Sequence, residues 1–229
     1  MKEKGFLLTQ KITKEGKMEK FLIIDVPCPE DTSERFENLG LTILDAKEMT
    51  EDLLVWPGWE TLKPWSTLVV FPGNGAKTVK KYIEKEKPFW FSKWPWKAAP
   101  NAKRVWILGE NPQAFVGRIN PGVLIGIKTV VVIDDVISSG VTIRELRKEN
   151  KNFIPMAKWQ AITWVMQEAA ITKGFSVIFS IKTVGSKKRK VPVNSLSTLV
   201  ECREIAESYA RRNFGDQAEA LLRLIESLC

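Results

Sequence analysis

The sequence has no histidine among its 229 residues. Without an imidazole, a Ser-His-Asp or Cys-His catalytic triad, a His-ligated zinc site and a His-ligated haem are all excluded. Cysteine is scarce as well, with three residues far apart in the chain: Cys28, Cys202 and Cys229. An odd number of cysteines without a CxxC pair favours neither a disulfide framework nor a zinc ribbon. We therefore expect a protein of the reducing cytoplasm.

Long hydrophobic runs are also lacking. No apolar run approaches the roughly 20 residues of a membrane span, and residues 1–20 alternate lysines with short apolar pieces, unlike a signal peptide. We expect a soluble protein that is not exported. Positive charge, in contrast, is abundant, because 35 Lys and Arg face 27 Asp and Glu, a formal net charge of +8. This charge favours an anionic partner and leaves nucleic acid, a membrane surface and a phosphorylated small molecule open.

Short β-rich runs alternate with helical segments along the chain. The expected strands are 21–26, 67–71, 104–108, 123–127, 129–133 and 175–181, and the expected helices are 33–38, 76–86, 157–172, 197–212 and 216–228. Residues 87–102, rich in tryptophan and lysine, are expected to form a long loop, and the basic run 187–190 a solvated one. The alternation predicts an α/β fold with a mostly parallel, twisted sheet flanked by helices.

The most informative segment is 130–142, with the sequence Val-Val-Val-Ile-Asp-Asp-Val-Ile-Ser-Ser-Gly-Val-Thr. Its apolar run predicts a buried parallel strand, which places the carboxylates of Asp134 and Asp135 at its carboxyl end. In an open α/β sheet this end borders the ligand crevice, where carboxylates can accept hydrogen bonds from sugar hydroxyls or lie near a ligand-borne metal ion. The hydroxyl groups that follow, and the backbone N–H groups around Gly140, suit a phosphate near the start of a helix.

This segment closely resembles the phosphoribosyl pyrophosphate binding motif of the type I phosphoribosyltransferases. That motif is an apolar strand, two acidic residues, two variable residues, two hydroxyl residues, glycine, a variable residue and a hydroxyl residue. The resemblance implies that Asp134 and Asp135 are the catalytic pair and hold the ribose hydroxyls. The residues that it implies for the 5′-phosphate are Ser138, Ser139, Gly140, Val141 and Thr142. Many members of the family have a second glycine where this chain has Val141.

A second and weaker match lies upstream, where the expected strand 67–71 is followed by a glycine-containing loop. In the family such a loop binds the pyrophosphate group, and the matching residues here are Pro72, Gly73, Asn74 and Gly75. Taken alone, this loop is more often an ordinary turn. It also partly fits a Walker A loop, but Ala76 separates the last glycine from Lys77, and this spacing argues against a nucleotide triphosphatase.

Near the tryptophan-rich segment 87–102, members of the family often have a mobile lid. The candidates for lid residues that reach the departing pyrophosphate are Lys93, Lys97, Lys103 and Arg104. Ordinary packing of the tryptophans against the body of the protein is the alternative interpretation of this segment.

The two motifs together imply a phosphoribosyltransferase of nucleotide salvage. Such an enzyme transfers phosphoribosyl from phosphoribosyl pyrophosphate to a nitrogen of a purine or pyrimidine base and releases pyrophosphate. The resemblance implies Mg²⁺, carried by the ligand near Asp134 and Asp135, and a homodimer. No membrane partner is expected, and nucleic acid is a less favoured partner. A non-catalytic sensor of phosphoribosyl pyrophosphate with the same fold is the alternative.

The resemblance covers residues 67–181 and leaves both ends of the chain unexplained. We expect an N-terminal elaboration at 1–62 that is a candidate for the hood over the base. A phosphoribosyltransferase-like core at 63–196 and a C-terminal helical pair at 197–229, packed on this core, complete the expected organisation. A polar insertion at 147–155, before the expected helix 157–172, departs from the family and leaves the acceptor base open.

Overall fold

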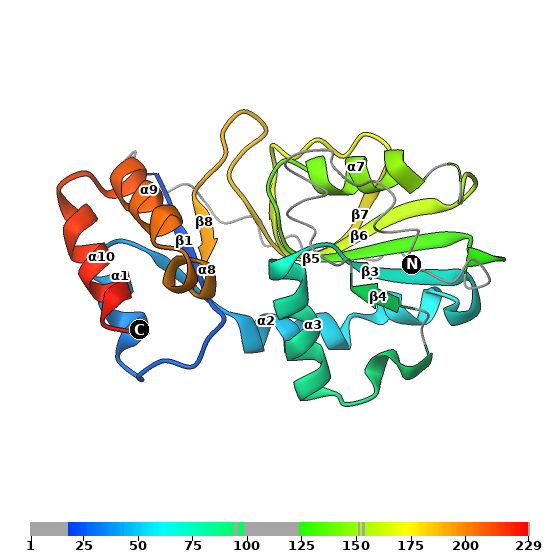
Figure 1. Cartoon of the computed structure of the whole chain (residues 1–229), viewed down its shortest axis with the longest axis horizontal. Coiled ribbons are helices and arrows are strands. Elements are labelled where there is room, and N and C mark those ends of the chain that lie inside the picture. Colours follow the sequence, from blue (N-terminus) through cyan, green and yellow to red (C-terminus); the bar gives the residue numbers. More distant parts are fainter. Residues whose placement is uncertain (1–17, 94–95, 99–123, 151, 153, 229) are drawn as a thin grey trace, which may run out of the picture.

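A five-stranded parallel sheet forms the centre of the larger of two lobes (Figure 1). The computed structural model describes residues 18–93, 96–98, 124–150, 152 and 154–228. In the order β4-β3-β5-β6-β7 the sheet contains β4 (Trp96–Ala98), β3 (Thr67–Phe71), β5 (Thr129–Ile137), β6 (Lys158–Gln167) and β7 (Ser176–Val184). The inner strands are almost continuously apolar because helices and connecting segments cover both faces of the sheet.

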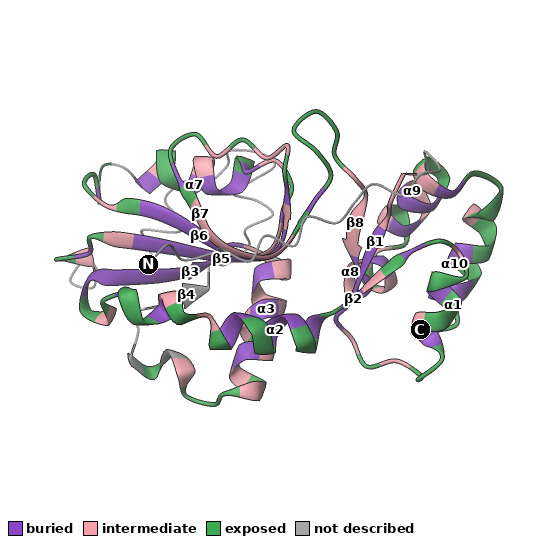
Figure 2. Cartoon of the chain, turned by 180° about the vertical axis from the view of Figure 1, so that it is seen from behind, coloured by how far each residue is buried: buried purple, intermediate pink, exposed green. Residues whose placement is uncertain are grey.

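Side chains of β3 and β5 alternate between two apolar clusters, one on each face of the sheet. On one face, Val69 and Val131 pack with α2 (Ala46–Val55) and α3 (Asn74–Glu86). On the other face, Val70 and Val132 pack with α7 (Val141–Asn150). The two faces are therefore covered by different parts of the chain, and Figure 2 shows the buried strands between these helices.

The smaller lobe is built from both ends of the described chain. Its three parallel strands, in the order β2-β1-β8, are β2 (Thr42–Asp45), β1 (Phe21–Ile24) and β8 (Val193–Ser195). Its helices are α1 (Thr32–Glu37), α8 (Leu196–Glu201), α9 (Arg203–Phe214) and α10 (Ala218–Glu226). Short 3-10 turns lie at Pro57–Thr61, Pro64–Ser66, Trp90–Lys93 and Gly215–Gln217.

Strand β1 connects the cores of the two lobes. Leu22 and Ile24 pack with the helices of the smaller lobe, whereas Phe21 and Ile23 belong to the cluster that continues under the large sheet. The C-terminal helices, which the sequence predicts to pack on the core, lie on the small sheet instead. Among the described residues, no helix is both long enough and apolar enough to cross a membrane.

Several expected elements are confirmed. Strand β3 has the predicted bounds, and β5 contains the whole predicted run and continues to Ile137. Strand β7 contains most of the predicted strand 175–181, and the basic run 187–190 is an exposed loop. The α/β architecture with parallel sheets and flanking helices is therefore the one that the sequence predicts.

The predicted helix 157–172 is wrong, because this segment forms strand β6. Trp159, Ile162 and Val165 have a spacing that suits one helix face, but a strand buried on both faces is also continuously apolar, and periodicity alone does not separate the two. As a consequence, α7 is followed directly by a strand. The second helix expected after the polar insertion does not exist.

Three smaller corrections concern turns and helix ends. The segment predicted as a long loop, 87–102, contains strand β4 and a 3-10 turn, and the described part of the predicted strand 123–127 is a turn. The predicted helix 197–212 is interrupted at Cys202, and its cap is Ser195, whose side chain accepts a hydrogen bond from the N–H of Thr198. The predicted strand 104–108 lies outside the described residues.

Candidate functional site

The order of the strands places a topological switch point between β3 and β5. From β3 the chain crosses to β4 on one side, and it later returns to form β5 on the other side. In open α/β sheets ligands bind in the crevice outside the carboxyl ends of the strands at such a point. Val70 of β3 pairs with Val132 of β5, so the segments that follow these strands lie side by side. These are the two segments that carry the predicted site residues.

The two predicted motifs are in direct contact. A Cβ atom added to Gly75 would lie 2.2 Å from the Oδ1 atom of Asp135, so the carboxylate of Asp135 rests against the backbone at the start of α3. These residues are 60 positions apart in the sequence. Tertiary structure therefore brings the acid pair and the predicted pyrophosphate segment together at the switch point.

The acid pair lies within β5, close to its carboxyl end. Asp134 is 7% exposed and Asp135 is half-buried. The carboxylate of Asp134 accepts a hydrogen bond from the N–H of Asp135 (3.1 Å), and that of Asp135 accepts one from the N–H of Val136 (2.8 Å). The hydroxyl of Thr163 in β6 lies 2.9 Å from the carbonyl oxygen of Asp135. The pair thus keeps free acceptor capacity on both carboxylates.

Burial and mutual repulsion disfavour two negative charges at this position. Burial raises the pKa of Asp134 well above its usual value, and the charge of Asp135 raises it further. Burial also raises the pKa of Asp135, and the negative charge of Asp25 in the smaller lobe acts in the same direction. A ligand that supplies hydroxyl donors or a cation would relieve this cost.

The predicted phosphate segment is a tight loop followed by the first turn of α7. Gly140 has φ of 69°, and a Cβ atom there would lie 2.6 Å from the carbonyl oxygen of Ile171, so only glycine fits without displacing a backbone. Ser138 and Val141 are exposed, Ser139 is half-buried and Thr142 is 8% exposed. The N–H of Val141 donates weakly to the hydroxyl of Ser139 (3.4 Å). The N–H groups of this helix start suit a phosphate.

Arg144, which the sequence analysis does not single out, holds this loop in place. Its Nη1 atom donates to the carbonyl oxygens of Ser139 (2.9 Å) and Ile171 (2.6 Å). Ile171 belongs to the connection 168–175 between β6 and β7 and donates its N–H to Ser139 (3.3 Å). No local pattern reveals this role, because the two partners of Arg144 are brought together only by the fold.

The predicted pyrophosphate segment is shorter as a loop than the sequence suggests, because Asn74 and Gly75 are the first residues of α3. Gly73 adopts φ of 153° and ψ of −173°, a conformation that is essentially restricted to glycine. The segment leads from Pro72 into a helix start beside Asp135. Its backbone N–H groups therefore lie at the same edge of the sheet as those of α7.

The lid candidates are only partly described. Lys93 ends the 3-10 turn Trp90–Lys93, and Lys97 lies in β4, paired with Val70 of β3, so it is not in a loop. Lys103 and Arg104 lie outside the described residues. The structure thus leaves the lid as a prediction for these four residues.

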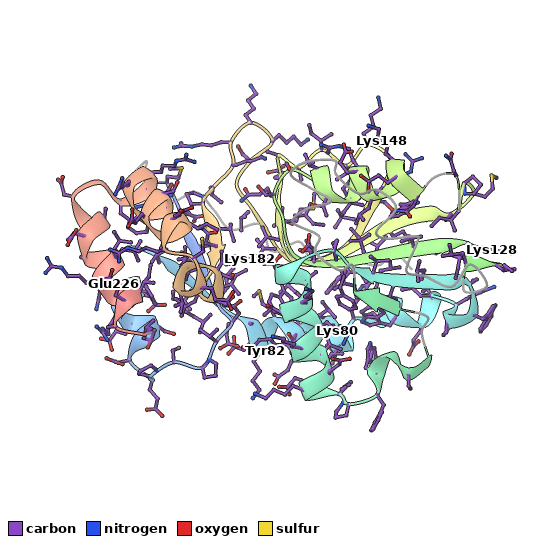
Figure 3. The ribbon with its side chains drawn as sticks, in the orientation of Figure 1. Lys80, Tyr82, Lys128, Lys148, Lys182 and Glu226 are labelled. Carbon is purple, nitrogen blue, oxygen red and sulfur yellow. The ribbon has the colours of Figure 1, made fainter. Side chains whose placement is uncertain are left out.

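A buried acid of the smaller lobe lies close enough to the switch point to influence the charge of Asp135. Asp25 directly follows β1, is 7% exposed and accepts hydrogen bonds from the N–H (2.8 Å) and the hydroxyl of Ser197. It raises the pKa of Tyr82 on α3, after burial as the larger cause. Tyr82 and Lys182 lie between the lobes in Figure 3, and the ammonium of Lys182 is 5.0 Å from the ring centre of Phe21. Nothing in the local sequence distinguishes Asp25 from any other polar residue that ends a strand.

Two carboxylates suit a magnesium ion that a ligand carries. Mg²⁺ prefers oxygen ligands and keeps several waters, so Asp134 and Asp135 fit it as outer partners rather than as a cage. Within the described part of the chain, no group of three or more Asp, Glu, Cys or His residues is arranged to hold a metal ion. A surface hollow on α9, lined by Glu204, Glu207, Ser208, Arg211 and Arg212, belongs to the other lobe.

Comparison with known proteins finds weak structural similarity and no match in sequence. No family model and no curated protein matches the chain. The structure is similar to a xanthine-guanine-hypoxanthine phosphoribosyltransferase from Helicobacter pylori, with a TM-score of 0.42 and 11% identity over 82% of this chain and 97% of the other. It is also similar to an orotate phosphoribosyltransferase from Aeropyrum pernix, with a TM-score of 0.38 and 17% identity over 59% and 70% of the two chains. Because both TM-scores are below 0.5, the fold is assigned from this chain's own strand order and contacts.

Proposed function

We propose that this protein is a phosphoribosyltransferase that transfers phosphoribosyl from phosphoribosyl pyrophosphate to a nitrogen of a purine or pyrimidine base. The observation that carries the proposal is the contact between Asp135 and Gly75 at the switch point of the sheet. Two sequence motifs that resemble one family's binding motifs independently of each other are neighbours in space. The pairing of β3 with β5 brings both motifs to one edge of the sheet, where a single ligand can reach them.

Each part of the proposed substrate has a matching group at this edge of the sheet. The ribose hydroxyls donate to the free acceptor positions of Asp134 and Asp135. The 5′-phosphate binds at the loop 138–142, where the N–H groups of α7 and the hydroxyls of Ser138 and Ser139 are within one turn. The pyrophosphate lies at the backbone of 72–75, next to the start of α3. Thus the substrate spans the two helix starts and passes over the acid pair.

The reaction displaces pyrophosphate from C1 of the ribose through a transition state with oxocarbenium character. Positioning and charge stabilisation carry the catalysis, because this chain's residues hold the sugar at its hydroxyls and phosphate while C1 changes partner. When bound with the substrate, Mg²⁺ neutralises negative charge on the pyrophosphate. The base approaches from the space between the lobes, where Asp25 and Tyr82 lie. We also propose a homodimer.

Titration calorimetry with phosphoribosyl pyrophosphate and Mg²⁺ tests the binding site. We expect the native protein to bind and the double variant Asp134→Asn with Asp135→Asn to lose at least about tenfold in affinity, because each carboxylate hydrogen bond contributes about 1.5–3 kcal/mol. Asp216→Asn, an exposed acid on the smaller lobe, is the matched control and retains binding. Unchanged binding by the double variant contradicts the proposed site.

A panel of purine and pyrimidine bases, followed by pyrophosphate release, tests the reaction. Turnover with one base identifies the acceptor. If the protein binds phosphoribosyl pyrophosphate tightly but releases pyrophosphate with no base in the panel, it is a sensor with the same site rather than a transferase. The two experiments therefore separate a wrong site from a wrong activity.

A further inference from the structure

A basic hairpin projects from the molecule between β7 and β8 and has no part in the proposed reaction. Its tip carries four consecutive exposed cations, Lys187, Lys188, Arg189 and Lys190. In Figure 1 it is the long loop that rises between the two lobes, after the end of β7 and before β8. We call residues 185–191 the basic finger.

The basic finger is a defined structure rather than a loose loop. Ser186 donates its N–H to the carbonyl of Arg189 (2.8 Å), and Arg189 donates back to Ser186 (3.1 Å), so Lys187 and Lys188 form a two-residue turn. At its base, Gln167 of β6, only 2% exposed, donates from Nε2 to the carbonyl of Val191 (2.7 Å) and accepts from its N–H (3.1 Å). The buried amide and the turn thus order the backbone that carries the four cations, which lowers the backbone entropy lost on binding.

Acidic side chains do not neutralise these charges within the described structure. The ion pairs there involve α1, α2, α3, α9 and α10, and none includes a residue of the basic finger. The last turn of α7 adds Arg147 and Lys148, both exposed. Figures 1 and 2 show α7 and the finger on the same side of the molecule, and Lys148 points outward there in Figure 3.

The side chains of the tip are cationic, with no apolar residue among positions 186–190, and this composition favours some classes of partner over others. Lysine is depleted in protein–protein interfaces, and stable membrane binding needs apolar side chains that enter the lipid, which positions 186–190 lack. A nucleic acid is the partner that suits a cluster of cations without apolar neighbours best, since the release of counterions from its phosphates drives binding. A single strand can curl around a narrow tip, whereas duplex DNA stays stiff over about 150 base pairs and meets such a tip at few phosphates.

We propose that the basic finger binds the phosphate backbone of single-stranded nucleic acid, independently of base sequence. The four cations contact phosphates, and Arg147 and Lys148 extend the surface. This binding does not involve the acid pair. The RNA-binding proposal can therefore be tested separately from the proposed phosphoribosyltransferase activity.

Fluorescence anisotropy with a labelled 20-nucleotide RNA of mixed sequence tests the proposal. The finger variant replaces residues 187–190 with glutamine, and the control variant replaces four exposed lysines elsewhere, Lys63, Lys81, Lys85 and Lys158. Both variants lose the same net charge. We expect the finger variant to bind RNA at least about tenfold more weakly at 50 mM salt. The slope of log affinity against log salt concentration should also be smaller in magnitude by up to about 3, because each phosphate contact on a single strand contributes about 0.7 to this slope.

An arginine variant and a comparison of nucleic acid with other anionic partners complete the test. The variant with Lys187→Arg, Lys188→Arg and Lys190→Arg keeps the charge and should retain RNA binding. Circular dichroism of this variant and of the glutamine variant shows whether a loss of RNA binding comes from misfolding. Equal weakening in the finger and control variants overturns the proposal, since net charge alone would then explain binding. Finger-dependent binding that is tighter to duplex DNA, or to vesicles with 30% phosphatidylserine, than to RNA overturns it in favour of those partners.

Discussion

At the scale of the residue, the acid pair is a place where function opposes stability. Asp134 is buried beside another carboxylate, and none of the ion pairs among the described residues includes it. Burial of such a charge costs free energy unless the group is paired or protonated. This cost is understandable if a ligand that donates hydroxyl groups is bound during the working cycle.

Asp134→Asn is therefore expected to stabilise the ligand-free protein at neutral pH. The pKa of Asp134 is higher in the folded than in the unfolded chain. The free-energy cost of its buried charge is therefore absent below the pKa of the unfolded chain, near 3.9. This cost lowers the stability as the pH rises through the pKa of the folded chain. The gain in melting temperature from the substitution should be largest at pH 7 and shrink toward pH 4. Thermal unfolding in buffer with a chelator measures it, with Asp216→Asn as the control. A gain that is independent of pH would show that ionisation of Asp134 is not its source.

The contact between Gly75 and Asp135 gives a second prediction. In Gly75→Ala the new methyl group would overlap the carboxylate of Asp135, so this side chain must turn away from the site. We expect at least about tenfold weaker binding of phosphoribosyl pyrophosphate. Stability should change little, because the overlap is with the end of a side chain that can turn away. Calorimetry and urea unfolding separate the two effects, with the exposed Lys81→Ala on the same helix as the control. Unchanged affinity would show that the two motifs do not share a ligand.

At the scale of the element, β6 is the strand whose secondary structure the sequence predicts wrongly. It lies between β5 and β7 and pairs with both in parallel. Thr163 on this strand bonds to the backbone of Asp135, and Gln167 at its end holds the basic finger. One strand thus supports both the acid pair and the basic finger, and both sites depend on β6 being a strand.

The side chain that best tests β6 as a buried strand is Trp164. It is fully buried, and its ring meets Tyr82 of α3 edge to face at 5.9 Å. Trp164→Ala should lower the free energy of unfolding by about 3–5 kcal/mol. Trp65→Ala, at a residue that is 76% exposed, should change it by less than about 0.5 kcal/mol. Urea unfolding followed by circular dichroism compares them, and similar losses in the two variants would contradict the placement of Trp164.

At the scale of the whole molecule, the two lobes have separate apolar clusters that meet at β1. The small sheet is made of strands from both ends of the described chain, and Asp25 bonds to Ser197, 172 positions away. The position of Asp25 near the acid pair therefore depends on the correct folding of both ends. Any ligand between the lobes would be contacted by both of them.

Substitutions in one lobe should loosen that lobe first. Leu221→Ala removes a fully buried side chain of α10, and Ile143→Ala one of α7 that is 1% exposed; each should cost about 2–5 kcal/mol. We expect Leu221→Ala to reduce the protection of β1 and β2 against hydrogen exchange more than that of β5 and β6, and Ile143→Ala to do the reverse. Equal loss of protection throughout in both variants would show that the lobes unfold as one unit.

The sequence by itself determined the features that depend on neighbouring residues. The apolar run before Asp134, the loop at Gly140 and the solvated basic run 187–190 are visible in it, since strand and loop formation are largely local. Tertiary structure alone decided the rest. β6 is a strand because the sheet buries it on both faces, and Gly75 meets Asp135 because β3 pairs with β5. Asp25 is held near the acid pair because both ends of the described chain fold together. Local sequence periodicity does not predict contacts between residues that are far apart in the chain, and such contacts form the candidate site.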